Sequence, residues 1–319
     1  MTDGLILVTG SAGHLGEAIM RTLQSQGRHA RGIDVKSSPF TNAVGSITDS
    51  AFVRGHLRDV TAVIHCATLH KPHVETHSAR EFIDTNIAGT LVLLEESVHA
   101  GVRAFVYTST TSAFGSALSP LAAQPAVWVT ESTTSIPRNI YGVSKAAAES
   151  VCELFHRRDG LPVVILRTAR FFPEADDDPA IRSAYTTANV QVNELLYRRA
   201  DIEDVVDAHL LAVACAPRIG FGRYIISATT PFTTNDLLDL RRATPTVVRS
   251  HVPGFEPVFA ARGWRMFASI DRVYVNDLAR RELGWRPKYD FAYAIAQLRA
   301  GHDHRSELAR TIGVKGYHV

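Results

Sequence analysis

The chain contains 319 residues, of which 45% are hydrophobic and 21% charged, and its formal net charge is +2. This composition is typical of a globular protein and gives no indication of a nucleic-acid partner or an anionic membrane surface. The three cysteines form no CxxC pair, and no signal peptide or run of about 18 apolar residues occurs, so we expect a cytoplasmic protein without a disulfide framework.

Short apolar runs alternate with longer amphipathic stretches through the first two-thirds of the chain. The apolar runs predict buried strands at 5–9, 30–34, 62–66, 104–109 and 162–167. The amphipathic stretches predict helices at 15–26, 79–100 and 141–158. Nearly continuous apolar strands that alternate with helices are typical of a parallel sheet covered on both faces. The sequence therefore predicts an α/β fold with a doubly wound parallel sheet.

The pattern changes after residue 167. Prolines and an acidic run predict an irregular segment over 171–189, followed by a helix at 201–214 and a strand at 223–227. We expect residues 1–168, with 200–229 returning to it, to form the sheet domain. Residues 169–199 and 230–319 are then expected to form a smaller C-terminal, substrate-binding lobe.

A glycine-rich turn, TGSAGHLG at 9–16, follows the first predicted strand and opens the first predicted helix. Glycines allow a tight turn and close approach of a pyrophosphate, which the helix N-terminus then attracts. Asp34 ends the second predicted strand, where a carboxylate accepts hydrogen bonds from ribose hydroxyls and repels a 2′-phosphate. This favours NAD over NADP, and the positive charge of Lys36, two residues further on, weakens that preference. The pattern indicates a Rossmann-like NAD site, although a plain glycine-rich turn is the alternative.

Tyr141 and Lys145 are four residues apart, so a helix places them on one face. A tyrosine ionises at about pH 10, and an adjacent ammonium group together with an oxidised nicotinamide is expected to lower that pKa by about 1–3 units. The phenol would then exchange a proton with a substrate hydroxyl. Thr110 directly follows the strand predicted at 104–109, where open α/β sheets bind ligands. A solvated surface pair is the alternative interpretation of Tyr141 and Lys145.

Together these residues resemble the extended short-chain dehydrogenase/reductase family, also called the NAD-dependent epimerase/dehydratase family. The resemblance also rests on HCAT at 65–68, TNIAGT at 85–90 and YTSTTSAFG at 107–115. It implies a catalytic group of Thr110, Tyr141 and Lys145, with Asn86 holding the nearby helix, and a homodimer formed through helices 79–100 and 141–158. The residues expected to bind NAD are Gly10, Ala12, Gly13, His14, Leu15, Gly16, Asp34, Ser46, Ile47, Cys66, Ala67, Thr68 and Lys145.

Several positions depart from that family. Dehydratases place an Asp-Glu pair where this chain has Thr111 and Ser112, so dehydration is not expected. Ser46 replaces a frequent adenine-binding aspartate. His70 and Arg170 replace a lysine and an asparagine that often meet nucleotide-sugar substrates in epimerases.

The substrate is therefore expected to be smaller than a nucleotide sugar, for example a sugar acid or polyol. Thr111, Ser112, His70 and Arg170 are the predicted substrate-binding residues, with Arg170 on a carboxylate or hydroxyls. The alternative is that Arg170 pairs with Glu174 or with the acidic run at 176–178.

A cluster of histidines at 65, 70, 73 and 77 lacks a convincing ligand set, so we expect no metal site. Three functions remain open. The first is an NAD-dependent dehydrogenase acting on a secondary alcohol or ketone of a carbohydrate-like molecule, and the second is a sugar or nucleotide-sugar epimerase that retains its cofactor. The third is an NAD-sensing regulatory protein.

Overall fold

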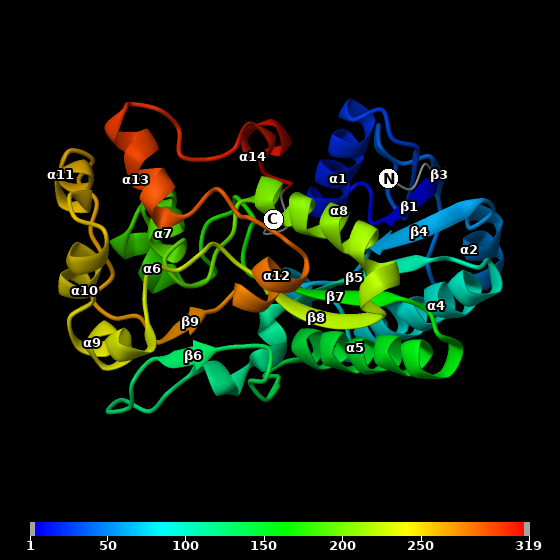
Figure 1. Ribbon diagram of the computed structural model, residues 1–319, viewed down its shortest axis with the longest axis horizontal. Coiled ribbons are helices and arrows are strands. Elements are labelled where there is room, and N and C mark those ends of the chain that lie inside the picture. The colour runs from blue at the N-terminus through cyan, green and yellow to red at the C-terminus, as the bar shows by residue number, and fades with distance from the viewer. Residues whose placement is uncertain (1–3, 316–319) are drawn as a thin grey trace.

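The computed structural model describes residues 4–315. Its centre is a seven-stranded sheet with the order β3-β2-β1-β4-β5-β7-β8, in which neighbouring strands are parallel (Figure 1). This order, with crossovers on both sides of β1, confirms the predicted Rossmann-like, doubly wound α/β fold. The strands are β1 (Leu5–Thr9), β2 (Ala30–Asp34), β3 (Ala43–Val44), β4 (Val60–His65), β5 (Ala104–Thr110), β7 (Val163–Thr168) and β8 (Phe221–Ile226).

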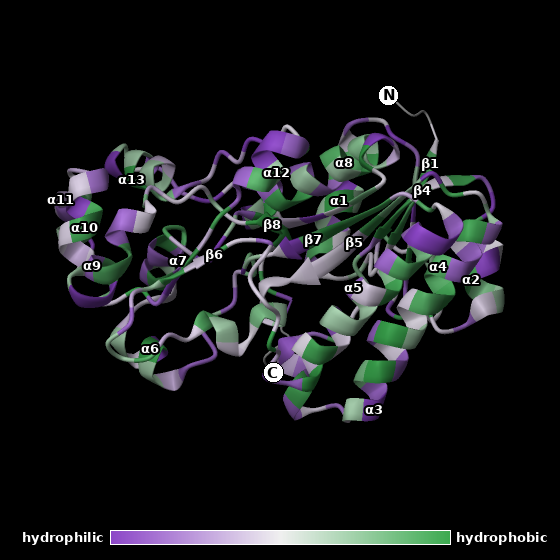
Figure 2. Ribbon diagram, turned by 60° about the horizontal axis from the view of Figure 1, so that its bottom comes forward, coloured by the Kyte–Doolittle hydropathy of each residue, from purple (hydrophilic) through white to green (hydrophobic). Residues whose placement is uncertain are grey.

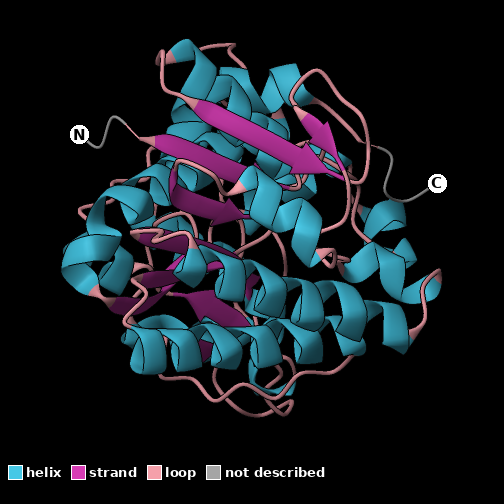
Figure 3. Cartoon of the chain, turned by 90° about the vertical axis from the view of Figure 1, so that its right-hand side faces the viewer, coloured by secondary structure: helices cyan, strands magenta, loops and turns pink. Residues whose placement is uncertain are grey.

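Helices cover both faces of this sheet (Figure 3). Alternate strand residues point to opposite faces, as the pleat requires. One face packs against α1 (His14–Ser25) and α8 (Ile202–Ile219), and the other against α2 (Ser50–His56), α4 (Gly89–His99) and α5 (Ile140–Asp159). Figure 2 shows the apolar strands enclosed between helices that carry polar residues.

The predicted helix at 79–100 is not continuous. It consists of α3 (Ala79–Phe82), a π-helical turn η2 (Ile83–Ala88) and α4. A π turn inserts an extra residue into the helix, and such turns often occur at functional sites. Here the turn contains Asn86, whose side chain is buried.

A second apolar cluster forms the smaller lobe, on the left of Figure 1. Its elements include a parallel pair of strands, β6 (Val127–Val129) and β9 (Arg272–Tyr274). Its helices are α6 (Pro179–Ala184), α7 (Thr187–Glu194), α9 (Leu237–Arg242), α10 (Thr244–His251), α11 (Phe255–Ala260) and α13 (Phe291–Arg299). The chain also forms short 3-10 helices, η1 (Lys71–Glu75), η3 (Thr111–Phe114), η4 (Ser116–Leu118) and η5 (Thr234–Asp236).

The C-terminal third does not pack wholly in this lobe. Residues of α12 (Asp277–Glu282), the following Trp285, and Ile312 at the end of α14 (Glu307–Ile312) belong to the main core beside α1 and α8. The predicted assignment of all of 230–319 to the smaller lobe therefore does not follow the packing, because these apolar side chains complete one face of the central sheet. Within residues 4–315, no helix combines the length and apolar character needed to cross a membrane.

Candidate active site

A cavity of about 780 Å³ runs along the carboxyl ends of the strands. The strand order places Asp34, at the end of β2, and Arg170, after β7, toward opposite sides of the sheet, with the ends of β4 and β5 between them. Open α/β sheets bind ligands at this edge. Apart from Asn86, the predicted site residues all line the cavity: Gly10, Ala12, Gly13, His14, Leu15, Gly16, Asp34, Ser46, Ile47, Cys66, Ala67, Thr68, His70, Thr110, Thr111, Ser112, Tyr141, Lys145 and Arg170.

The glycine turn leaves no room for larger residues. Gly10 has a φ of +73°, and a Cβ there would lie 2.7 Å from the backbone nitrogen of Ala67. A Cβ on Gly16 would lie 1.9 Å from the carbonyl oxygen of Gly10. Gly13 caps α1 without a side-chain hydrogen bond, so the first amide N–H groups of the helix remain available to an anion. This cradle fits the pyrophosphate of a dinucleotide.

Asp34 is tied to the same turn. Its Oδ2 accepts a hydrogen bond from the backbone N–H of Ala12 at 3.0 Å, and its Oδ1 accepts one from the N–H of Lys36 at 2.8 Å. Both contacts fix the carboxylate at the cavity wall, where it retains lone pairs for a ribose diol. Ser46 also lines the cavity, and its hydroxyl shares a 2.7 Å hydrogen bond with Thr48.

A buried histidine fixes the loop after β4. His65 is hydrogen-bonded through Nδ1 to the hydroxyl of Thr9 at 2.8 Å and through Nε2 to Thr90 at 3.0 Å. The Thr9 hydroxyl also accepts the N–H of Ala67 at 3.1 Å. Burial lowers the pKa of His65 well below its usual value, and Lys145 lowers it further. The histidine is therefore neutral, and both of its ring nitrogens are engaged in hydrogen bonds that hold the loop.

Tyr141 and Thr110 converge in the cavity. Tyr141 lies in the first turn of α5, where the Asn139 side chain accepts the N–H of Gly142 at 2.9 Å. Burial raises the pKa of Tyr141 to about 12, although a hydrogen bond with Thr110 lowers it. Desolvation of the phenolate thus outweighs the hydrogen bond in the protein alone, whereas the lowered pKa expected from the sequence refers to the site with an oxidised nicotinamide.

Lys145 lies one turn along the same helix, and its side chain is buried. Its Nζ is 4.1 Å from the centre of the Tyr107 ring. Burial lowers the pKa of Lys145 to about 8, whereas Cys152, Cys66 and Glu149 raise it. The ammonium form therefore predominates at neutral pH, and the group can donate hydrogen bonds into the cavity.

Asn86, which was grouped with the catalytic residues as the one that holds the nearby helix, does not line the cavity, and its contacts are those of a positioning residue. Its Nδ2 donates to the carbonyl of Leu69 and to the hydroxyl of Ser144, both at 2.9 Å. Its Oδ1 accepts from the N–H of Leu69 at 2.8 Å and from the hydroxyl of Thr68 at 3.0 Å. Ser144 in turn donates to the carbonyl of Tyr141. Asn86 thereby joins the loop after β4 to the helix that carries Tyr141 and Lys145.

Arg170 lines the cavity but is already paired. Its guanidinium contacts Asp176 at 2.6 Å and Glu194 at 3.5 Å, and it donates to the carbonyl of Ala175 at 3.3 Å. The alternative interpretation, an ion pair with the acidic run, therefore describes the structure. Asp176 thus takes the guanidinium that was expected to bind a substrate carboxylate or hydroxyls. His70 stacks on Phe172, with ring centres 5.6 Å apart.

Other residues also contribute to the site, and of these only Arg198 was considered from the sequence, as a candidate for substrate contact or a surface residue. A buried ion pair between Arg167 and Glu149, at 2.7 Å, joins β7 to α5, and Ser109 of β5 donates to the same carboxylate. Arg198 and Arg272 line the cavity from segments distant in sequence. A run of two arginines at 198–199 was the only local signal, and nothing in the sequence near Arg272 distinguishes it.

Comparisons with known proteins give a consistent picture. The model of the NAD dependent epimerase/dehydratase family matches residues 6–220. UDP-glucose 4-epimerase of Azospirillum brasilense is 26% identical over 98% of this chain and 94% of its own length. dTDP-glucose 4,6-dehydratase of Streptomyces antibioticus is 28% identical over 92% and 90%. An uncharacterized protein, y4nG, of Sinorhizobium fredii is 34% identical over 169 residues, and the chain spans only 39% of its length.

The solved structures that resemble the chain share its fold. A short-chain dehydrogenase/reductase superfamily protein from Agrobacterium tumefaciens with bound NAD has a TM-score of 0.64 at 24% identity. That likeness covers 93% of this chain and 97% of the other. Because the likeness extends over nearly the full length of both chains, it includes the smaller lobe as well as the central sheet.

Proposed function

The chain belongs to the NAD-dependent epimerase/dehydratase family of extended short-chain dehydrogenases/reductases, with NAD as its cofactor, and on this premise we propose that it interconverts a secondary alcohol and a ketone on a carbohydrate-like small molecule. The observation that carries the proposal is that Thr110, Tyr141 and Lys145 line the same cavity as the glycine turn. NAD, when bound, accepts or returns the hydride.

The residues of the chain supply the proton transfer. Thr110 holds the substrate oxygen, and Tyr141 takes the hydroxyl proton on oxidation or gives it back on reduction. With a pKa of about 12, the phenol holds its proton at neutral pH. It can therefore donate that proton when the substrate ketone is reduced. Oxidation requires a positive charge beside the phenol that offsets its burial. Lys145, which is protonated at neutral pH, is the residue of this chain that supplies such a charge.

The substrate is proposed to be a sugar acid or a polyol. Thr111 and Ser112, in η3, offer only hydroxyl groups, which do not perform the acid and base steps of dehydration. Dehydration is therefore not proposed, although one relative is a dehydratase. Thr111, Ser112 and His70 lie on the cavity wall where they would contact such a substrate.

The test measures NADH absorbance while the purified protein is offered NAD with sugar acids, polyols and nucleotide sugars. We expect turnover of at least one sugar acid or polyol. Tyr141→Phe is expected to lower kcat about 10²-fold or more while NAD affinity, measured by calorimetry, stays unchanged. Wild-type protein that binds NAD without turning over any member of the panel would instead favour an NAD-sensing protein.

A second candidate is an epimerase that oxidises and then reduces its substrate on the same enzyme. The similarity to a UDP-glucose 4-epimerase over nearly the whole chain favours it. The two candidates share the residues named above and differ in the fate of NADH. Substrate isomerisation without release of NADH would support the epimerase, and stoichiometric release would support the dehydrogenase.

We further propose a homodimer formed through α4 and α5, which pack side by side. Large apolar side chains are exposed on η2, α4 and α5, namely Ile83, Leu91, Val143 and Leu154. Val143 and Leu154 are eleven residues apart on α5, which places them on one face of the helix three turns apart. Apolar side chains exposed on neighbouring helices are a surface that an interface between subunits would cover.

A further inference from the structure

The C-terminal segment, residues 313–315, lies against the first turn of α1, far from it in sequence. His14, the first residue of α1, contacts the carbonyl oxygen of Gly313 through Nε2 at 3.1 Å and Oε1 of Glu174 at 3.2 Å. Because both of these neighbours are hydrogen-bond acceptors, Nε2 carries the ring hydrogen. Figure 1 shows α14, which leads into the segment, beside α1. The dinucleotide-binding turn therefore contacts both the C-terminal segment and the loop after β7.

Lys315 adds two contacts from the same segment. Its backbone N–H donates to Oε1 of Glu174 at 3.2 Å, and its Nζ forms an ion pair with Glu17, in the first turn of α1. Glu17 also pairs with Arg21 at 2.8 Å. Burial would raise the pKa of Glu17, but Lys315 and Arg21 lower it below its usual value, so the carboxylate is ionised at neutral pH. Lys315 thus places a positive charge against a largely buried carboxylate at the start of α1.

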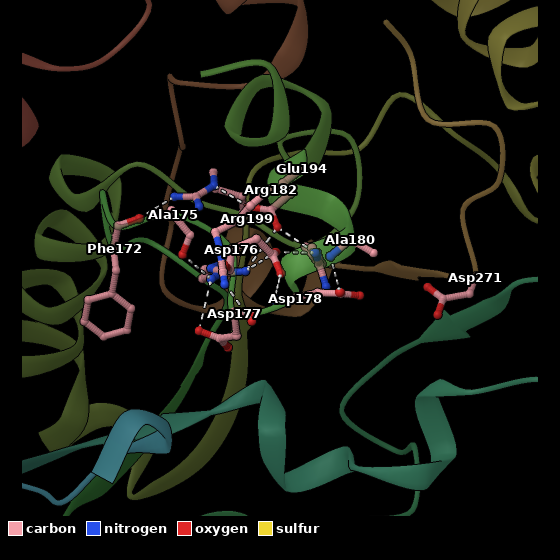
Figure 4. A network of polar contacts seen from close by, with 12 residues as sticks. Phe172, Ala175, Asp176, Asp177, Asp178, Ala180, Arg182, Glu194, Arg199 and Asp271 are labelled. Carbon is pink, nitrogen blue, oxygen red and sulfur yellow. Dashed lines mark hydrogen bonds and ion pairs between the residues drawn. The ribbon is translucent and has the colours of Figure 1, made fainter. Parts of the chain in front are cut away.

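The loop after β7, which carries Glu174, is fixed by its own contacts. The carbonyl of Phe172 accepts a hydrogen bond from Arg199 at 2.9 Å. Figure 4 shows Phe172 beside the polar network that contains Arg199. The Phe172 ring meets the ring of His14 edge-on, with ring centres 5.4 Å apart. Glu174 therefore extends from a supported loop toward the first residue of α1.

The C-terminal segment is held at its start by α14. Ile312, the last residue of α14, is buried in the main core. Gly313 follows with a φ of +60°, a conformation that favours glycine and directs the chain away from the helix. The side chain of Lys315 is 24% exposed and lines the cavity, as do His14 and Glu174. The segment is therefore part of the cavity wall beside the glycine turn.

We propose that Glu174 and the C-terminal segment contain positioning residues of the cofactor site, which hold the first turn of α1 and slow the release of NAD. The first amide groups of α1 are the donors available to a pyrophosphate, so their direction depends on how this turn is held. Lys315 also offsets the charge of Glu17, a carboxylate that would otherwise repel an anion at the same helix end. The inference goes beyond the proposed reaction, because it concerns cofactor exchange and requires no sugar substrate.

The test measures the release of NADH from the full-length protein without any sugar. Protein loaded with NADH is mixed with excess NAD in a stopped-flow instrument, and the loss of the fluorescence of bound NADH gives the dissociation rate. Lys315→Met is expected to release NADH about 10-fold faster than the wild type, since changes within one binding site act mostly on dissociation. Glu174→Ala removes the carboxyl group that His14 and Lys315 both contact, and it should have at least the same effect. Equal dissociation rates in the wild type and both variants would overturn the proposal.

Lys288→Met is the matched control, because Lys288 is exposed and does not line the cavity. Its dissociation rate should equal that of the wild type. The double variant Glu17→Gln with Lys315→Met tests the charge argument. Without the carboxylate, loss of the ammonium group should matter less, so this variant is expected to release NADH more slowly than Lys315→Met alone. Release as fast as in Lys315→Met would overturn the role of this ion pair.

Thermal unfolding without cofactor separates positioning from a general loss of structure. Lys315→Met is expected to unfold cooperatively, with a Tm close to that of the Lys288→Met control. Faster release from such a folded variant supports the proposal, whereas faster release only in variants that have lost cooperative unfolding would overturn it. Because no sugar is present, the result does not depend on turnover. Unchanged release of NADH leaves the oxidoreductase proposal in place, and absence of turnover leaves this test intact.

Discussion

Asn86→Ala removes the side chain that joins the loop after β4 to the helix carrying Tyr141. Four hydrogen bonds are lost, and each contributes about 1 kcal/mol net to stability. The loss of unfolding free energy is therefore at most about 4 kcal/mol. The Leu69 carbonyl keeps a bond from Thr68, and the Ser144 hydroxyl keeps its bond to the Tyr141 carbonyl. Only the Leu69 N–H loses its acceptor entirely. We therefore expect the free energy of unfolding to fall by about 2–4 kcal/mol.

Thermal unfolding followed by circular dichroism measures this loss. With an unfolding entropy of about 2.1 cal/mol/K per residue, the whole chain gives about 0.7 kcal/mol/K, so the Tm should fall by about 3–6 °C. Because α5 loses its support, kcat should fall about 10- to 100-fold. NAD affinity should change less, since Asn86 does not line the cavity.

Two further variants separate the contacts of Asn86. Asn86→Asp keeps the acceptors for Thr68 and Leu69 but cannot donate to Ser144. Ser144→Ala removes only the link to α5, so its kcat should fall while the loop after β4 is unaffected. A folded Asn86→Ala enzyme with the kcat of the wild type would refute the positioning role.

Three other changes have definite expected outcomes. Gly16→Ala places a Cβ against the Gly10 carbonyl and should weaken NAD binding, measured by calorimetry, about 10-fold or more. The control is Gly160→Ala, where the added Cβ meets open space. That variant should lower the stability measured by thermal unfolding and leave NAD binding unchanged. Burial lowers the pKa of Lys145 from 10.5 to about 8. Between these two pH values, the folded wild-type protein therefore binds fewer protons than the unfolded protein. Its stability relative to Lys145→Met in urea unfolding should therefore rise from about pH 8 to 10.5, and a flat difference would contradict the burial of the ammonium group. Val143→Glu, on the exposed face of α5, should convert a dimer into a monomer in light scattering, unless the wild type is itself monomeric.

Local sequence patterns predicted the central sheet because each strand and helix there has its own periodicity. β1 and β2 match the predicted runs at 5–9 and 30–34, and the glycine turn lies between β1 and α1. The motif residues also meet at one edge of the sheet, since the carboxyl ends of parallel strands share that edge. Short elements such as β3, β6 and β9 were missed, because two or three residues carry too little periodicity to identify a strand.

The role of Arg170 was not predictable from sequence, because its partner was ambiguous. A sequence shows an arginine near an acidic run but not whether the two meet, and here Asp176 takes the guanidinium. Arg272 shows the opposite case. It reaches the cavity only because β9 packs beside the segment that contains Tyr197, a contact between residues that no local pattern connects.

The pKa values of the titratable groups around Tyr141 have one common cause. Burial raises the pKa of Tyr141 and of Cys66 to about 12 and lowers those of Lys145 and His65. Each shift favours the neutral form, as expected in a site of low polarity. A charge that enters such a site acts on the phenol with little screening. Small changes of charge beside Tyr141 should therefore alter its proton affinity strongly.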